Sequence, residues 1–224
     1  MRLGGFARAA VALLCLASCA AAQGETLAPS AESNSPGAFQ KATQTGAVTS
    51  AVFDFELSGF SYHIAANGNG RRTKGDKTRR FNLRPDRGDY IEGLYFSGYD
   101  GNLLLVCGVT DEETGGGLVV KLEQPSMRAL WRQQIPAFNL GEPLREGRRL
   151  YVTGIGFVGA LDLKTGMYEW KHAGLYENAG GKFNSFELPE IKGDEVLFRE
   201  RPVDNTPGKT IRVSRKTGKI VRIE

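Results

Sequence analysis

The sequence predicts an all-β domain of short antiparallel strands, and three observations support this fold class. Apolar runs of about four to eight residues, alternating or continuous, follow one another from residue 50 onward. Turn residues separate them, and Gly alone makes up 29 of the 224 residues, roughly twice the usual ~7%. Beyond residue 22, no segment keeps a helical apolar period over three turns. Because parallel strands need long crossovers, connections this short indicate antiparallel neighbours.

The first residues have the layout of an export signal. Two arginines precede an apolar run at 9–17, which is too short to span a bilayer core of ~30 Å. The segment Leu16-Ala17-Ser18-Cys19 resembles the lipobox of bacterial lipoproteins, which implies cleavage after residue 18 and a lipid on Cys19. Because Ala20 and not Asp follows, the resemblance also implies sorting to the outer membrane. The alternative is cleavage within residues 20–22, which leaves a soluble periplasmic or secreted protein.

A flexible tether is expected after the signal. Residues 20–50 contain no aromatic side chain except Phe39 and no sustained apolar period. About 30 such residues have an r.m.s. reach of roughly 30 Å, enough to hold a domain clear of a membrane surface. The expected organisation is therefore a signal peptide at 1–18, a tether at 19–49 and one folded domain at 50–224.

The strands of the domain follow from the apolar pattern. Residues 51–57 alternate apolar and polar side chains, as a half-buried strand requires, and residues 103–109 are almost continuously apolar, as in a fully buried strand. The expected strands are 51–57, 60–65, 90–96, 102–109, 118–122, 128–134, 149–153, 158–163, 167–172, 195–200, 210–214 and 219–223.

An internal repeat organises these strands. Its clearest copy has Ala160, Asp162, Thr165, Gly166 and Trp170 as fixed positions, with degraded copies ending at Trp131 and, through Thr217 and Gly218, at Arg222. The three end positions lie 39 and 52 residues apart, which brackets the ~40–45 residues of a four-stranded propeller blade.

Each fixed position has a physical role. Gly166 permits the positive φ of a tight turn, where Asp162 and Thr165 can bond to the local backbone. Trp170 offers a large surface for packing one sheet on the next, and the small Ala160 leaves room for it. In the last copy Arg222 replaces the tryptophan, so that sheet is expected to lie at an edge with less to pack against.

This pattern resembles the PQQ-like β-propeller repeat with its tryptophan-docking motif, over residues 90–224. The resemblance implies a small or incomplete β-propeller of about four four-stranded antiparallel blades, of which three are clear. It leaves open whether the propeller closes. More distantly, the chain is similar to the eight-bladed propeller lipoproteins of the outer-membrane β-barrel assembly machinery.

Few residues in the sequence are candidates for catalysis or for metal or cofactor binding. With Cys15 in the signal and Cys19 acylated, Cys107 alone remains, inside an apolar strand where a packed thiol is expected. His63 and His172 lie on separate strands, where solvated or hydrogen-bonded rings are expected, and the acidic run 111–113 is expected to be a hairpin tip and not a calcium site. Quinoproteins with this repeat carry adjacent cysteines and a calcium-ligand cluster, which are lacking here. We therefore expect no catalytic residue, no metal and no cofactor.

The strongest charge feature is the segment 71–89, which is expected to be a loop. It has three Asp and a net charge of +5, from the eight cations Arg71, Arg72, Lys74, Lys77, Arg79, Arg80, Arg84 and Arg87. Such a loop could bind an acidic protein surface, anionic lipid head groups or lipopolysaccharide phosphates. The alternative is a solvated loop without a partner. Nucleic acid is not expected, because export separates the protein from it.

The sequence thus favours a non-catalytic cell-envelope lipoprotein that acts as a protein-binding or scaffold platform. Its expected contacts are an envelope protein and, through the lipid anchor, the membrane, with homo-oligomers through an open sheet edge as a further expectation. One alternative is a small quinoprotein-like or calcium-dependent enzyme subunit. Another is a structural subunit whose open propeller is completed by a partner or a second copy.

Overall fold

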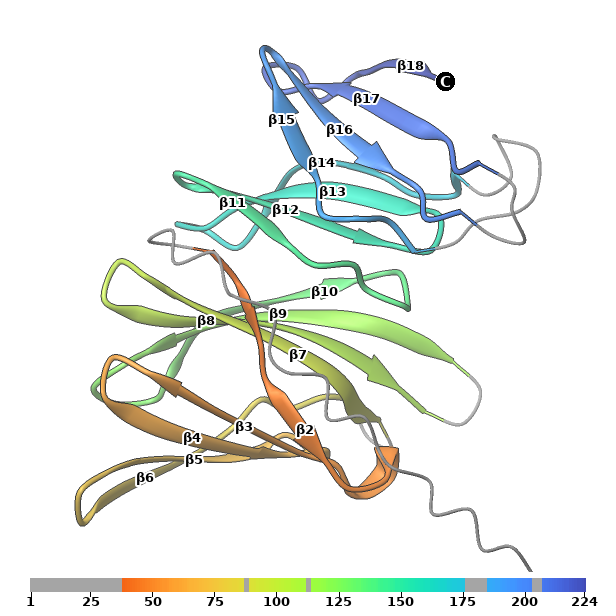
Figure 1. The fold of residues 1–224 in the computed structure, drawn as a ribbon. Coiled ribbons are helices and arrows are strands. Elements are labelled where there is room, and N and C mark those ends of the chain that lie inside the picture. The colour runs from red at the N-terminus through yellow and green to blue at the C-terminus, as the bar shows by residue number, and fades with distance from the viewer. Residues whose placement is uncertain (1–37, 87–88, 112–113, 176–184, 203–206) are drawn as a thin grey trace, which may run out of the picture. The chain divides into compact units, whose positions relative to one another are not determined.

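The computed structural model describes residues 38–86, 89–111, 114–175, 185–202 and 207–224. The predicted signal peptide and Cys19 lie outside these ranges. The described residues confirm the all-β prediction, with eighteen strands in four antiparallel sheets (Figure 1). They include a 3₁₀ turn at Val48–Ser50, and no helix among the described residues could cross a membrane.

Each sheet is built mostly from strands that are consecutive in the chain. The first sheet contains β2 (Thr43–Thr45), β3 (Val52–Leu57), β4 (Phe60–Ala65), β5 (Asn69–Lys74) and β6 (Lys77–Asn82). The second contains β1 (Gln40–Lys41), β7 (Tyr90–Tyr99), β8 (Asn102–Thr110), β9 (Gly115–Glu123) and β10 (Ala129–Ile135). The third contains β11 (Leu144–Glu146), β12 (Arg149–Gly154), β13 (Phe157–Asp162) and β14 (Tyr168–His172). The fourth contains β15 (Glu190–Lys192), β16 (Glu195–Arg199), β17 (Thr210–Ser214) and β18 (Ile220–Ile223).

Three hydrophobic cores hold the sheets face to face, one between each successive pair. Strand β8 shows why its sequence is continuously apolar: Leu103, Leu105 and Cys107 face the core shared with the first sheet, and Leu104 and Val106 face the core shared with the third. In the described residues no buried cluster joins the first sheet to the fourth. The fold is therefore an incomplete β-propeller of four blades, the open form of the two that the repeat allowed.

The outer faces of the first and fourth sheets carry hydrogen-bonded and ion-paired polar side chains, and strand β18 at the edge of the fourth also exposes Val221 and Ile223. On the first sheet, Asp54 accepts a hydrogen bond at 2.9 Å from His63 on the neighbouring strand. On the fourth, Arg212 bonds to Glu195 at 3.1 Å and to Glu224 at 2.6 Å. Terminal repeats with polar outer faces can cap a stack of repeats.

The N-terminal segment corrects the predicted boundary of the folded domain. Residues 38–49 were assigned to the tether, but β1 pairs with β7 and β2 pairs with β3, so one short segment joins two sheets. Phe39 is buried in the core between the second and third sheets, and Ala42 in the core between the first and second. From the sequence, a polar segment with one aromatic residue is interpreted as a linker. The strands with which it pairs cannot be recognised from the local pattern, because β7 lies about 50 residues further along the chain.

Candidate functional site

The docking motif works between neighbouring sheets, as the sequence predicted. Trp170 on β14 lies against Gly218 in the β17–β18 turn of the next sheet, where an added Cβ would come within 2.4 Å of the indole ring. Trp131 on β10 lies in the same way on Gly166 of the third sheet, with 2.5 Å to such a Cβ. Its Nε1 also donates a hydrogen bond to the Leu163 carbonyl at 3.3 Å. Ala160 was expected to make room for Trp170, and it is the cross-strand neighbour of that residue. The space for the indole ring on the next sheet comes instead from Gly218, which has no side chain.

The turn residues act as predicted. Gly166 and Gly218 have φ values of +75° and +68°. The Asp162 carboxylate accepts a hydrogen bond from the Lys164 amide at 2.7 Å, and the Thr165 hydroxyl accepts one from the Met167 amide at 3.2 Å. Thr217 repeats this contact with the Lys219 amide at 3.3 Å. At the edge sheet, Arg222 forms an ion pair with Glu224 at 2.8 Å in place of a docking contact.

The histidines and the described cysteine all have structural contacts. His172 Nε2 lies 2.7 Å from the Gly218 carbonyl, so this ring reinforces the Trp170 docking contact. Burial raises the pKa of the Cys107 thiol to about 12, which keeps it protonated and unreactive at neutral pH. Among the described residues, no three His, Cys, Asp or Glu side chains gather closely enough to hold a metal ion.

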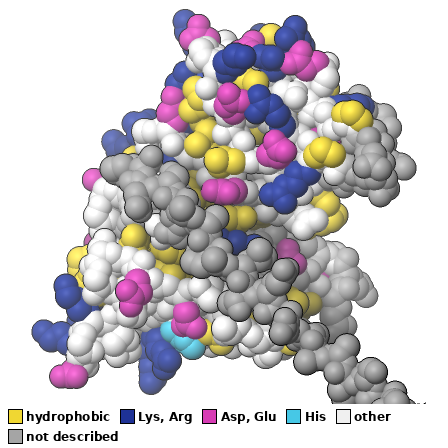
Figure 2. Space-filling view, viewed as in Figure 1, with side chains coloured by type: hydrophobic (Ala, Val, Ile, Leu, Met, Phe, Trp, Pro, Cys, Tyr) yellow, Lys and Arg dark blue, Asp and Glu magenta, His cyan; other side chains and the backbone are white. Residues whose placement is uncertain are grey.

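The basic segment was expected to be a loop. Its residues up to Asn82 instead belong to a regular hairpin of β5 and β6 around a turn at Gly75-Asp76. We call residues 69–82 the basic hairpin. Figure 2 shows Lys and Arg side chains at the lower left, where Figure 1 places these strands. The pairing register sets like charges opposite one another: Arg71 faces Arg80, Arg72 faces Arg79 and Lys74 faces Lys77. Like charges in directly opposed positions destabilise a sheet, so this arrangement costs stability.

Arg72 differs from the other cations of the basic hairpin. Its guanidinium is half-buried, lies 4.4 Å from the centre of the Phe60 ring and donates hydrogen bonds to the backbone carbonyls of Gln124 and Pro125 in the second sheet. Gln124 in turn donates to the Tyr62 hydroxyl at 3.1 Å. Arg72 therefore joins the first sheet to the β9–β10 turn of the second, so its guanidinium has a structural role within the chain.

This contact predicts different effects for two arginines that face each other. Arg72→Ala is expected to lower the free energy of unfolding by about 1.5 kcal/mol, because it leaves two inter-sheet carbonyls without their charged donor. Arg79→Ala, on an exposed side chain, is expected to change it by less than ~0.5 kcal/mol. Urea denaturation followed by circular dichroism measures both. Equal losses for the two variants would contradict the docking role of Arg72.

The two remaining predicted cations lie apart from the basic hairpin. Arg84 has a positive φ of +52° in the segment after β6, and Arg87 lies outside the described residues. Arg84 borders a cavity of about 420 Å³ that the sequence did not predict, because its lining comes from four separate segments. No local motif links them.

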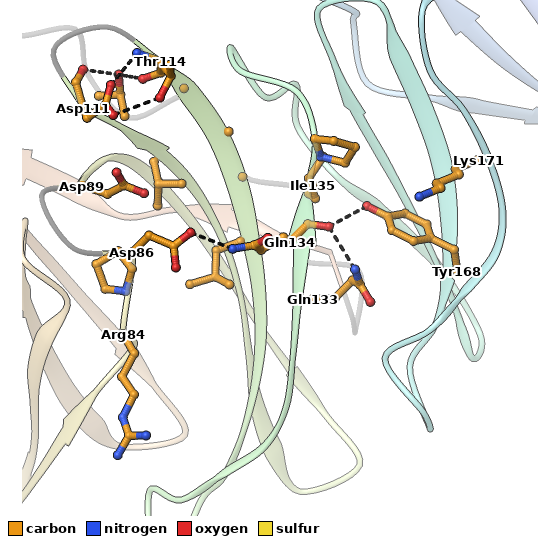
Figure 3. A pocket seen from close by; sticks show the side chains of 18 residues that line it. Arg84, Asp86, Asp89, Asp111, Thr114, Gln133, Gln134, Ile135, Tyr168 and Lys171 are labelled. Atoms are coloured by element: carbon orange, nitrogen blue, oxygen red, sulfur yellow. Dashed lines mark hydrogen bonds between the residues drawn. The ribbon is translucent and has the colours of Figure 1, made fainter.

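Figure 3 shows how the sides of this cavity are connected. Gln134 on β10 donates a hydrogen bond to the Asp86 carboxylate at 2.8 Å and accepts one on its backbone carbonyl from the Tyr168 hydroxyl at 3.0 Å. Burial, followed by the charges of Asp111 and Asp86, raises the pKa of Asp89. The polar groups of the cavity are thus largely engaged with one another, and they hold the second and third sheets together.

Comparison with known proteins gives one family and several structural neighbours. A family model described as "Outer membrane protein assembly factor BamB" matches residues 72–223. No curated protein matches the chain. Among solved structures, a europium-containing methanol dehydrogenase is similar with a TM-score of 0.52 and 11% identity, over 76% of this chain and 40% of that one. The computationally designed Ika8 protein is similar with a TM-score of 0.50 and 8% identity, over 82% and 61%.

At these identities the structural neighbours show the fold alone. The chain spans less than two thirds of the length of either neighbour. The residues that carried the expected resemblance, from Trp131 to Gly218, lie within the segment that the family model matches. The predicted PQQ-like repeat is therefore confirmed.

Proposed function

Since this chain belongs to the family of the outer membrane protein assembly factor BamB, we propose that it is a non-catalytic protein of the cell envelope that presents a rigid β-propeller surface to protein partners. The match over residues 72–223 is the observation that carries the proposal. An envelope location agrees with the export signal expected from the sequence. We further propose that a lipid on Cys19 anchors the protein at the outer membrane.

The engagement of the reactive side chains supports a structural role for the described residues. Cys107 is fully buried, His172 lies against the Gly218 carbonyl, and His63 is bonded to Asp54. The docking tryptophans and Arg72 fix each sheet to the next by contacts that need no ligand. A stack of sheets fixed in this way suits the presentation of loops and edges to a partner.

The polar outer faces disfavour a partner that completes the propeller by packing on them. Such a partner would have to cover the ion pairs of Arg212 with Glu195 and Glu224, and the removal of paired charges from water is costly. Partners are more readily accommodated at loops and strand edges, which leave these faces in water.

Affinity capture from envelope extract, followed by reconstitution with the purified partner, tests the proposal. We expect a saturable complex between the mature chain and an envelope protein, and palmitate labelling that is lost in Cys19→Ala. Failure to reconstitute any captured partner would contradict the platform role, and labelling that persists in Cys19→Ala would contradict the anchor.

Thermal unfolding with added pyrroloquinoline quinone and Ca²⁺ tests the enzymatic alternative. We expect an unchanged melting temperature, because a ligand stabilises a protein only when it binds the folded state. A saturable upward shift would favour a quinoprotein-like enzyme.

A further inference from the structure

Strand β6 forms an edge of the first sheet. It pairs with β5 and is the last strand in the order β2-β3-β4-β5-β6 (Figure 1). In an antiparallel pair, every second residue of an edge strand directs its backbone N–H and C=O groups away from the sheet. Such a row of unpaired groups is a template for an added strand.

The charges along this edge determine what kind of strand could pair with β6. Lys77 and Arg79 point to one face of the sheet and Arg80 to the other, and all three are exposed. Within the part of the chain that the structure describes, none of these three side chains forms an ion pair. Their opposite neighbours on β5 are also cations, so the hairpin carries a like-charge repulsion that an added anion would reduce.

Protection of the edge against aggregation explains part of this pattern. Lysine on an edge strand prevents pairing with other edges, and the charge of the basic hairpin repels a second copy of itself. A single cation would serve that purpose, whereas here three of the six facing pairs of the basic hairpin are like-charged. The excess favours an acidic partner.

We propose that an extended acidic segment of a partner protein adds to the edge of β6 as a further strand. The proposal rests on the protein-binding function proposed above. An added strand places successive side chains on opposite faces, so its carboxylates would meet Lys77 and Arg79 on one face and Arg80 on the other. A flat anionic surface, such as a membrane, reaches only one face at a time.

Two neighbouring features define the limits of this edge. At the end of β6, Arg132 of the second sheet donates hydrogen bonds to the Asn82 and Leu83 carbonyls at 3.3 and 3.2 Å, so the added strand ends there. On the outer face, a hollow of about 540 Å³ is lined by Arg71, Arg80, Thr73 and Thr78, and also by Asp54, whose carboxylate is bonded to His63. It gives room for a carboxylate beside the Arg71–Arg80 pair.

Fluorescence anisotropy with an acidic nine-residue peptide tests the proposal. The peptide has Glu at five consecutive central positions, and a second peptide of the same charge carries N-methyl groups on alternate residues of its pairing edge. We expect the mature chain to bind the first peptide and to bind the methylated peptide at least tenfold more weakly, because the N-methyl groups remove backbone donors. Equal binding of the two peptides would overturn strand addition.

Matched variants locate the site. The triple variant Lys77→Gln, Arg79→Gln, Arg80→Gln is expected to bind the first peptide about tenfold more weakly, because three opposite-charge pairs are lost. The control Lys164→Gln, Lys192→Gln, Lys216→Gln removes the same charge from exposed positions in the third and fourth sheets and is expected to bind as the parent does. Equal urea midpoints establish that both variants are folded.

The remaining outcomes also decide the proposal. No binding up to millimolar peptide, or binding only to phosphatidylglycerol vesicles, would overturn it. A captured envelope partner that binds the parent and the triple Gln variant equally would overturn the β6 site and leave the proposed function intact. Failure to find any partner, with peptide binding as expected, would contradict the proposed function alone.

Discussion

Replacing Gly218 with Ala is expected to lower the free energy of unfolding by about 3 kcal/mol. Ala at a φ of +68° is strained by about 1 kcal/mol. Its Cβ would also lie 2.4 Å from the Trp170 ring, so the indole must move away and the docking of the third sheet on the fourth is lost. Gly166→Ala is expected to act in the same way through Trp131. Urea denaturation followed by tryptophan fluorescence measures the loss.

Gly193→Ala is the matched control for this experiment. Gly193 has a φ of +59° in the β15–β16 turn, but no atom lies within 4 Å of the position its Cβ would occupy. This variant keeps the backbone strain and removes the collision, so it is expected to cost only about 1 kcal/mol. If Gly218→Ala and Gly193→Ala are equally destabilising, the packing of tryptophan on glycine contributes nothing to the stability of the fold.

Phe39→Ala is expected to lower the free energy of unfolding by about 3 kcal/mol, the usual cost of removing a buried phenyl ring. Phe39 is 6% exposed and packs in the core between the second and third sheets. It secures β1 on β7 next to the point where the Ala42 amide donates to the Leu94 carbonyl at 2.9 Å. Urea denaturation gives the magnitude, and hydrogen exchange of the Ala42 amide is expected to accelerate.

Val48→Ala separates this effect from a general sensitivity of the N-terminal segment. Val48 lies in the same predicted tether but is 46% exposed, so its truncation is expected to change the free energy of unfolding by less than ~0.5 kcal/mol. An equally small effect of Phe39→Ala would restore the predicted tether boundary at residue 49.

Local sequence was sufficient for the turns of the docking motif. Asp162, Thr165 and Gly166 form their turn by contacts within a few residues, so their spacing alone predicted the geometry. The copy of the motif that ends at Trp131 keeps the turn geometry without the glycine. Met127 replaces the glycine there and still has a φ of +59°, because its side chain is buried in the core between the first two sheets.

The basic hairpin shows where local sequence was insufficient. Charged and polar residues fill β5 and β6, so no apolar alternation marked them as strands. Their strand conformation comes from pairing with β4 and from contacts such as that of Arg72 with Gln124 and Pro125, which lie more than 50 residues along the chain. The same limit applies to the cavity bordered by Asp86 and Tyr168, whose sides meet only in the folded chain.

The sequence by itself therefore determined the all-β class, the repeat and the docking positions, because turn chemistry and apolar alternation act between residues close in the chain. Only the tertiary structure decided that the Gly-rich turns receive the tryptophans of the preceding sheets and that Phe39 belongs to the core. It alone also gave the open arrangement with polar outer faces and the facing cations of an edge strand. These features depend on which distant segments pack together, and the free energy of that packing is shared among residues that no local pattern connects.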